Sequence, residues 1–208
     1  MTADKESRTG WNHNLHYHRL VLGAVPAQCG RALDAGCGVG TLARKLARQC
    51  EHVVGIDADG DVIRKARTAS WLPPNLELVI GDALTEPLEP GSFDFVTAVA
   101  SLHHMELEPA LAKFSSLLRP GGKLAVVGLY RPETLWDYVS CAAALPVSLA
   151  VRGILTAEKV QARLAEPLES LKEIRQTAEA VLPGCKLRRL FFVRYWLEWE
   201  KTDERTNC

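Results

Sequence analysis

Residues 33–43, with the sequence LDAGCGVGTLA, constrain the fold of this chain more than any other stretch. A short apolar segment at residues 31–35 predicts a buried strand, and three glycines at alternate positions follow it. The apolar residues of segment 41–50 recur three and four apart, which predicts a helix. The glycines therefore occupy a strand-to-helix turn. Because glycine has no Cβ, this turn can adopt positive φ and approach a bound molecule closely, so we expect a ligand here.

The spacing of the glycines and the acid before them indicate a cationic ligand. A turn that binds a pyrophosphate has the pattern G-x-G-x-x-G, whereas Gly36, Gly38 and Gly40 form G-x-G-x-G. The carboxylate of Asp34 would repel a phosphate and attract an ammonium or sulfonium. The string D-x-G-C-G-x-G resembles the first motif of class I S-adenosylmethionine-dependent methyltransferases. A glycine-rich turn that binds nothing is the structural alternative.

Further strands are predicted at residues 52–57, 75–80, 93–99 and 123–129, with helical segments between them. Asp57 ends the second strand about twenty residues past the glycines, where Rossmann-like folds place the carboxylate that binds a ribose. This landmark fits adenosylmethionine and a nicotinamide dinucleotide equally. The string L-R-P-G-G-K-L at residues 118–124 also resembles the family's turn before its fifth strand, so the resemblance spans residues 31–130.

The resemblance implies a set of cofactor contacts. In the family an acid after the third strand receives the adenine amino group, which assigns this role to Asp82 and the ring contact to the following amide of Ala83. A simple turn cap is the alternative role for Asp82. Backbone at residues 98–100 would hold the methionine end. The cofactor-binding residues implied in this way are Trp11, Tyr17, Asp34, Gly36, Cys37, Gly38, Gly40, Asp57, Ala58, Asp82, Ala83, Ala98 and Ala100.

Two imidazoles, His103 and His104, follow the predicted fourth strand. Ligands of open parallel sheets bind beyond the carboxyl ends of the strands, so both rings are expected in the crevice. A histidine can take the proton that an acceptor hydroxyl or amine loses around methyl transfer. The alternative is that the rings only orient the loop.

The segment WNHNLHYHRL at residues 11–20 holds three of the six histidines. Its H-x-x-H-x-H spacing permits a metal site, a helix cap or a lid. Because a fourth ligand is not evident, we expect no metal. In related methyltransferases an N-terminal segment folds over the cofactor, and residues 1–25 are assigned to such a lid. Trp11 and Tyr17 would then contact the cofactor, while His13 and His16 would face the acceptor as candidate catalytic residues.

The last part of the chain follows the family pattern less closely. Residues 131–168 contain aromatic residues, an apolar run and proline breaks, and we expect them to form a small helical cap over the acceptor pocket. Residues 168–182 predict a helix. In segment 186–200 apolar residues alternate with mostly polar ones and no turn residue interrupts them. We therefore predict one long, bent final strand, where the family usually has two antiparallel strands.

Composition narrows the functional class. The chain has 208 residues, 47% of them hydrophobic, with 25 basic and 25 acidic side chains, so one compact domain spanning residues 1–208 is expected. Neutrality argues against a nucleic-acid partner such as transfer RNA. The basic cluster of Lys186, Arg188, Arg189 and Arg194 fits the solvated side of an edge strand. Six cysteines without metal or disulfide spacing, no signal peptide and no membrane-length apolar run predict a cytoplasmic protein with no membrane partner.

These features predict an α/β doubly wound, Rossmann-like sheet that is mostly parallel, with helices on both faces, an antiparallel final strand, an N-terminal lid and a cap. The predicted function is transfer of the methyl group of S-adenosyl-L-methionine to a small-molecule acceptor, with a role in secondary metabolism as one setting. A protein that binds adenosylmethionine without transferring its methyl, as a scaffold or a rearrangement or cyclisation enzyme, fits the same glycines. A nicotinamide-dependent reductase would need G-x-G-x-x-G and a Tyr/Lys pair, which the sequence lacks. The acceptor and the oligomeric state remain open.

Overall fold

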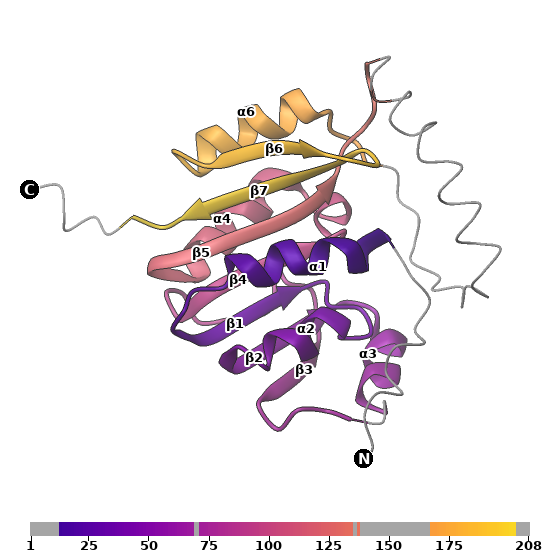
Figure 1. Cartoon of the computed structure of the whole chain (residues 1–208), viewed down its shortest axis with the longest axis vertical. Helices are drawn as coiled ribbons and strands as arrows, with labels where there is room; N and C mark the ends of the chain where they lie inside the picture. Colours follow the sequence, from indigo (N-terminus) through magenta and orange to yellow (C-terminus); the bar gives the residue numbers. More distant parts are fainter. Residues whose placement is uncertain (1–12, 69–70, 135–136, 138–166, 203–208) are drawn as a thin grey trace, which may run out of the picture.

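The computed structural model describes residues 13–68, 71–134, 137 and 167–202, and its centre is a seven-stranded sheet (Figure 1). The strands are β1 (Cys29–Ala35), β2 (Cys50–Asp57), β3 (Leu76–Ile80), β4 (Phe93–Val99), β5 (Leu118–Leu129), β6 (Lys186–Leu190) and β7 (Arg194–Glu200). The helices are α1 (His13–Ala24), α2 (Thr41–Leu46), α3 (Gly60–Arg67), the 3-10 turn η2 (Leu102–His104), α4 (Leu107–Leu117) and α6 (Leu171–Val181).

The order of the strands is β3-β2-β1-β4-β5-β7-β6. Strands β1 to β5 are parallel, whereas β7 runs antiparallel to β5 and β6 antiparallel to β7. The chain order reverses between β1 and β4, where Asp34 is level with Thr97. Open α/β sheets bind ligands at the carboxyl ends of such neighbouring strands. The predicted doubly wound, mostly parallel fold is confirmed.

Helices cover both faces of the sheet and make two apolar layers. One layer packs α1, α2 and α3 on the near face of Figure 1, and the other packs α4 and α6 behind it. Strand β7 shows how the pleat divides its side chains between them, because Tyr195 and Leu197 join the α4–α6 layer and Trp196 joins the other. Asp59 begins α3 by accepting hydrogen bonds from the amides of Asp61 and Val62.

The prediction of one long final strand is wrong. The chain reverses at residues 191–193, so that Leu190 of β6 pairs with Arg194 of β7. Phe192 and Val193 have φ of 62° and 48°, a conformation that is rare for bulky and β-branched residues. Turns are recognised in a sequence by glycine, proline and short polar residues, and this turn has none of them.

Contacts from distant parts of the chain stabilise this reversal. The Tyr130 amide donates to the Val193 carbonyl at 3.1 Å, and the Tyr17 hydroxyl donates to the Phe191 carbonyl at 3.0 Å. Tyr130 directly follows β5 and Tyr17 is in α1, so no local sequence pattern could have predicted the turn.

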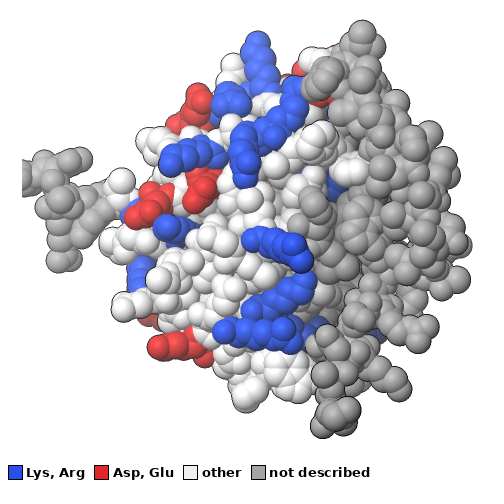
Figure 2. Space-filling view, viewed as in Figure 1, with Lys and Arg blue, Asp and Glu red and all other residues white. Residues whose placement is uncertain are grey.

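The basic cluster is divided by this turn. Strand β6 is the edge of the sheet, and Lys186, Arg188 and Arg189 on it are exposed, as predicted. Arg194 is different, because it is the first residue of β7 and is half-buried near the carboxyl end of β5. Figure 2 shows Lys and Arg side chains gathered over the face that carries α1, α2 and the β6 edge. The predicted cap at 131–168 lies largely outside the described residues.

Comparison of Gly36 with Gly184 separates the steric cost of an added side chain from the cost of placing that side chain at positive φ. Both have positive φ, at 75° and 79°, but an added Cβ would overlap the Cβ of Ser101 at Gly36 and would meet nothing within 4 Å at Gly184. We expect Gly184→Ala to lower the free energy of unfolding by roughly 1 to 2 kcal/mol. Gly36→Ala should lower it by roughly 3 to 5 kcal/mol, since overpacking adds to the same strain. Urea unfolding measures both, and equal losses would contradict this packing of Ser101 on Gly36.

Candidate active site

The glycine-rich turn between β1 and α2 is shaped by hydrogen bonds from its own backbone. The amides of Gly36 and Cys37 donate to the Ile56 carbonyl at 2.8 and 3.0 Å, and the Gly40 amide donates to the Cys37 carbonyl at 2.9 Å. Gly36, Gly38 and Gly40 have φ of 75°, 55° and 74°. All three therefore use the left-handed region that glycine alone enters without strain.

Only one of these glycines faces open space. An added Cβ at Gly36 would strike Ser101, and at Gly40 it would lie 3.0 Å from a guanidinium nitrogen of Arg44. At Gly38 it would meet nothing within 4 Å. The open side of the turn is therefore at Gly38, where the absence of a side chain lets a ligand approach the backbone.

Asp34 lies beside this turn as a buried carboxylate. It is the second-last residue of β1, is 2% exposed, and its Oδ2 has no hydrogen-bond partner among the described residues. Burial, reinforced by the nearby charge of Asp57, raises the pKa of Asp34 to about 7. A buried carboxylate with an unused oxygen fits a cationic ligand, which would favour its ionised form.

Asp57, at the end of β2, holds the turn from the other side. Its Oδ2 accepts the Gly38 amide at 2.8 Å and its Oδ1 accepts the Asp59 amide at 2.9 Å. Each carboxylate oxygen can accept two hydrogen bonds, so Asp57 retains capacity for a ribose hydroxyl. Ala58 is exposed next to it. Asp57 thus has a positioning role that the sequence did not reveal, beside the predicted one.

Asp82 follows β3 at the same edge of the sheet. Its side chain is exposed, and Oδ1 accepts the Leu84 amide at 2.9 Å, which is the turn-capping role named as the alternative. A second ligand at this carboxylate is compatible with that bond. Ala83 is buried. Contact of these two residues with an adenine therefore stays a prediction.

The loop after β4 is tied directly to the end of β1. Ala98 is buried, and Ala100 has a φ of 53° while its amide donates to the Val127 carbonyl at 2.8 Å. Ser101 donates its hydroxyl to the Ala35 carbonyl at 2.6 Å and packs on Gly36. Sequence reasoning missed Ser101, because its contacts depend on β1 and β4 being neighbours.

His103 and His104 form a tilted pair with ring centroids 4.0 Å apart. His104 is exposed, whereas His103 is half-buried and its Nδ1 has no hydrogen-bond partner in the described part of the chain. Burial, together with the charges of His104 and Arg194, lowers the pKa of His103 to about 4. The His103 ring is therefore neutral at pH 7 and can accept a proton.

Helix α1 reaches this edge of the sheet through Tyr17. The Arg194 guanidinium lies 5.8 Å from the centroid of the Tyr17 ring, and its Nη1 donates to the Phe192 carbonyl at 3.3 Å. Tyr17 is buried in the α1–α3 layer, and its hydroxyl donates to the β6–β7 turn. Its predicted contact with the cofactor stays a prediction. Trp11 lies outside the described residues, as do the side chains of His13 and His16.

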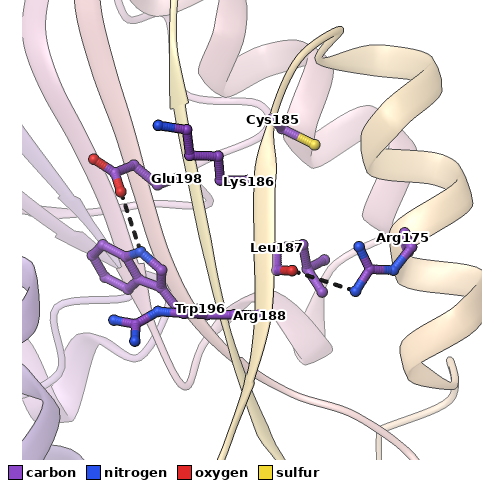
Figure 3. Close-up of a pocket in the computed structure, with 7 residues that line it drawn as sticks. All are labelled: Arg175, Cys185, Lys186, Leu187, Arg188, Trp196 and Glu198. Atoms are coloured by element: carbon purple, nitrogen blue, oxygen red, sulfur yellow. Dashed lines mark hydrogen bonds between the residues drawn. The ribbon is translucent and has the colours of Figure 1, made fainter.

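Three further observations concern metal, membrane and cavities. Within residues 13–68, 71–134, 137 and 167–202, no group of three His, Cys, Asp or Glu side chains could hold a metal ion. In the same ranges, every helix is too short or too polar to cross a membrane. A hollow of roughly 500 Å³ lies at the β6 edge of the sheet, four strands from β1, and does not belong to this site (Figure 3). Its lining residues are Arg175, Cys185, Lys186, Leu187, Arg188, Trp196 and Glu198.

Known proteins resemble the chain in sequence and in fold. A family model described as a methyltransferase domain matches residues 33–126. A protein of Mycobacterium tuberculosis, described as an uncharacterized methyltransferase, is 36% identical over 193 residues, which are 91% of this chain and 96% of that protein. The 2-phytyl-1,4-naphtoquinone methyltransferase of Thermosynechococcus vestitus is 36% identical over 111 residues, which are 51% of this chain and 49% of that protein.

One solved structure with the same fold contains the demethylated cofactor. It is phosphoethanolamine N-methyltransferase 2 of Haemonchus contortus in complex with phosphomonomethylethanolamine and S-adenosylhomocysteine. The TM-score is 0.66 at 18% identity, over 93% of this chain and 53% of that chain. At this identity the likeness shows the fold, and the kinship rests on the sequence matches.

The placement of the cofactor can be tested with two substitutions. Asp57→Ala should weaken S-adenosylmethionine binding by roughly 1 to 3 kcal/mol, because ribose hydroxyls and the Gly38 amide lose their acceptor. Gly38→Val should abolish binding, since its side chain would occupy the open side of the turn. Calorimetric titration measures both, with Asp61→Ala, an exposed residue of α3, as the control. Parent-like affinity in both variants would overturn this placement.

The raised pKa of Asp34 predicts a pH-dependent affinity. A cationic ligand requires the ionised carboxylate, so the affinity for S-adenosylmethionine should fall by up to about tenfold for each pH unit below 7. Without ligand the trend is opposite, because the folded state keeps the proton that the unfolded chain loses near pH 4. The free energy of unfolding should therefore decrease as the pH rises from about 4 through 7.

Calorimetry between pH 5.5 and 8 and urea unfolding over the same range and below, down to about pH 4, measure these two trends. Asp34→Asn should bind weakly and remove both pH dependences. A constant affinity of the parent protein across this range would show that Asp34 does not face the cation.

Proposed function

This chain belongs to the class I S-adenosylmethionine-dependent methyltransferases, and we propose that it methylates a small molecule held between the loop after β4 and the β6–β7 turn. S-adenosyl-L-methionine is its cofactor. The observation that carries the proposal is the neutral, half-buried imidazole of His103 at the carboxyl end of β4, beside the glycine-rich turn that follows β1. One side of the crevice suits the cofactor and the other presents a proton acceptor.

The cofactor side is acidic. Asp34, Asp57 and Asp82 come from the ends of β1, β2 and β3, which are adjacent in the sheet. S-adenosylmethionine carries a sulfonium and an ammonium, so these carboxylates complement its charge. We assign the cationic groups to Asp34, the ribose to Asp57 and the adenine to Asp82, with the open face of Gly38 against the cofactor. When bound, the cofactor supplies a methyl group on a positively charged sulfur, which makes that carbon electrophilic.

The acceptor side contains groups that can orient a nucleophile and take its proton. His103 is neutral at pH 7, so its ring can accept a proton from a hydroxyl or amine at its unpartnered Nδ1. Ser101 fixes this loop to the end of β1 through the Ala35 carbonyl, which holds His103 close to the cofactor turn. Orientation of the acceptor, and exclusion of water from the crevice, are the remaining contributions of the protein.

We assign residues 1–25 to a lid and 131–168 to a cap within a single domain, 1–208. Figure 1 shows the first turn of α1 at the edge toward which the arrowheads of β1 and β5 point. The Tyr17 hydroxyl anchors this helix to the β6–β7 turn. The described end of the cap is anchored too, because buried Asp137 accepts the Tyr130 hydroxyl at 2.8 Å and pairs with Arg189 at 3.1 Å. Both anchors support segments that close over the crevice.

Relatives support an acceptor of low molecular weight. The Thermosynechococcus protein is named for a naphthoquinone and the Haemonchus structure contains a phosphorylated amine, although this chain spans only about half of each. Equal numbers of acidic and basic residues argue against a nucleic-acid acceptor. The described cysteines Cys29, Cys37, Cys50 and Cys185 are free thiols, which supports our assignment of the protein to the cytoplasm.

The experiment is a methyl-transfer assay that follows S-adenosylhomocysteine formation with panels of phenols, amines and carboxylic acids. Once an acceptor is found, His103→Gln should lower kcat by about 10² or more, the usual contribution of a general base. Binding of S-adenosylmethionine should not change. His104→Gln, at the exposed ring, is the matched control and should retain most activity.

The pH profile gives a second readout. Because the pKa of His103 lies at about 4, its base form predominates above that value, and kcat of the parent should be flat from pH 6 to 8 and fall toward pH 4. A His103→Gln variant with parent-like kcat would remove the assigned base. Cofactor binding without turnover on any panel would indicate a protein that binds adenosylmethionine for another purpose.

A further inference from the structure

We infer that Arg44 is a positioning residue that holds the glycine-rich turn in the shape that binds the cofactor. Arg44 is on α2, one turn after the last glycine, and its guanidinium bridges three backbone segments. Nη1 donates to the Val39 carbonyl at 2.6 Å, Nη2 to the Ala66 carbonyl at 2.6 Å and Nε to the Trp71 carbonyl at 3.1 Å.

The three acceptors belong to parts of the chain that meet behind the cofactor turn. Val39 lies between the second and third glycines, Ala66 is in the last turn of α3, and Trp71 is in the connection from α3 to β3. The Ala66 carbonyl lies at the negative end of the helix dipole, where a cation is favoured. Arg44 thereby joins the turn after β1 to the helix that follows Asp57.

The bond to Val39 fixes a peptide plane of the turn. The carbonyl side of the Val39–Gly40 peptide accepts from Arg44, and its amide side donates to the Cys37 carbonyl at 2.9 Å. The peptide before Gly38 is fixed in the same manner, because the Gly38 amide donates to Asp57. Arg44 and Asp57 therefore hold the two flanks of Gly38, the residue whose open side faces the cofactor.

Arg44 acts from behind the turn. An added Cβ at Gly40 would lie 3.0 Å from its Nη1, so the guanidinium packs under Gly40, whereas the open side is at Gly38. Its effect on the cofactor is therefore indirect and acts through the backbone of residues 38–40. A guanidinium suits this task because its planar fork presents several donors in fixed directions, which an ammonium on a flexible stem cannot reproduce.

The inference predicts a graded loss of cofactor affinity. Arg44→Met keeps the apolar stem and removes the donors, and we expect it to bind S-adenosylmethionine about tenfold more weakly than the parent in calorimetry. Arg44→Lys can bond one carbonyl at a time, so its affinity should lie between those of the parent and Arg44→Met. The matched control is Arg64→Met, which removes an exposed arginine of α3 that pairs with Asp61 and should bind like the parent.

Hydrogen exchange distinguishes positioning from a general loss of stability. The measurement is made well below the melting temperature. In Arg44→Met the amides of residues 38–40 should exchange faster, while those of β1 and β4 keep their protection. Unchanged affinity in Arg44→Met would overturn the inference, as would an affinity loss accompanied by faster exchange throughout the sheet. If Arg44→Met does not fold, the affinities of Arg44→Lys and Arg64→Met are compared instead. Weaker binding by Arg44→Lys supports the inference, and equal binding overturns it. These readouts need no acceptor, so they stand independently of the proposed substrate.

Discussion

The hydrogen bond from the Gly38 amide to the Asp57 carboxylate joins the turn after β1 to the end of β2. Without it the glycine-rich turn would depend on bonds within its own backbone, on the Ile56 carbonyl and on Arg44. With it, the acid that we assign to the ribose also fixes the turn that we place against the cofactor. The site is therefore shaped before the ligand arrives, and less conformational entropy has to be lost on binding.

Most of the fold could be predicted because its signals are local. Buried strands that end in acids, glycine at a turn and a proline-glycine break each report their conformation within a few residues. The β6–β7 turn could not be predicted, since it is stabilised by bonds from Tyr17 and Tyr130 to the carbonyls of Phe191 and Val193 within the turn. Tyr17 is in α1 and Tyr130 directly follows β5, so no short window of sequence contains the reason for the turn.

The same distinction between local signals and distant contacts applies to the candidate site. Asp34 and Asp57 could be assigned to the site from their positions at the ends of strands, but their hydrogen-bond partners could not. Ser101 acts through the register of β1 beside β4, and Arg44 acts through carbonyls up to 27 residues away in the chain. Arg194 looked like one more solvated charge of an edge strand until the reversal placed it over Tyr17. Side-chain roles that depend on packing are visible only once the sheet order is known.

A cationic ligand would explain why this protein keeps Asp34, an unfavourable buried carboxyl, in its core. Burial raises the pKa of this carboxyl to about 7, and one of its oxygens has no partner among the described residues. Such a group destabilises the free protein near neutral pH, and a bound cation would offset that cost. Net charge hides this arrangement, because the acids at the ends of β1, β2 and β3 are balanced over the whole chain by arginines and lysines that lie elsewhere. The local departure from neutrality, more than the total, therefore supports our assignment of a sulfonium cofactor to this edge of the sheet.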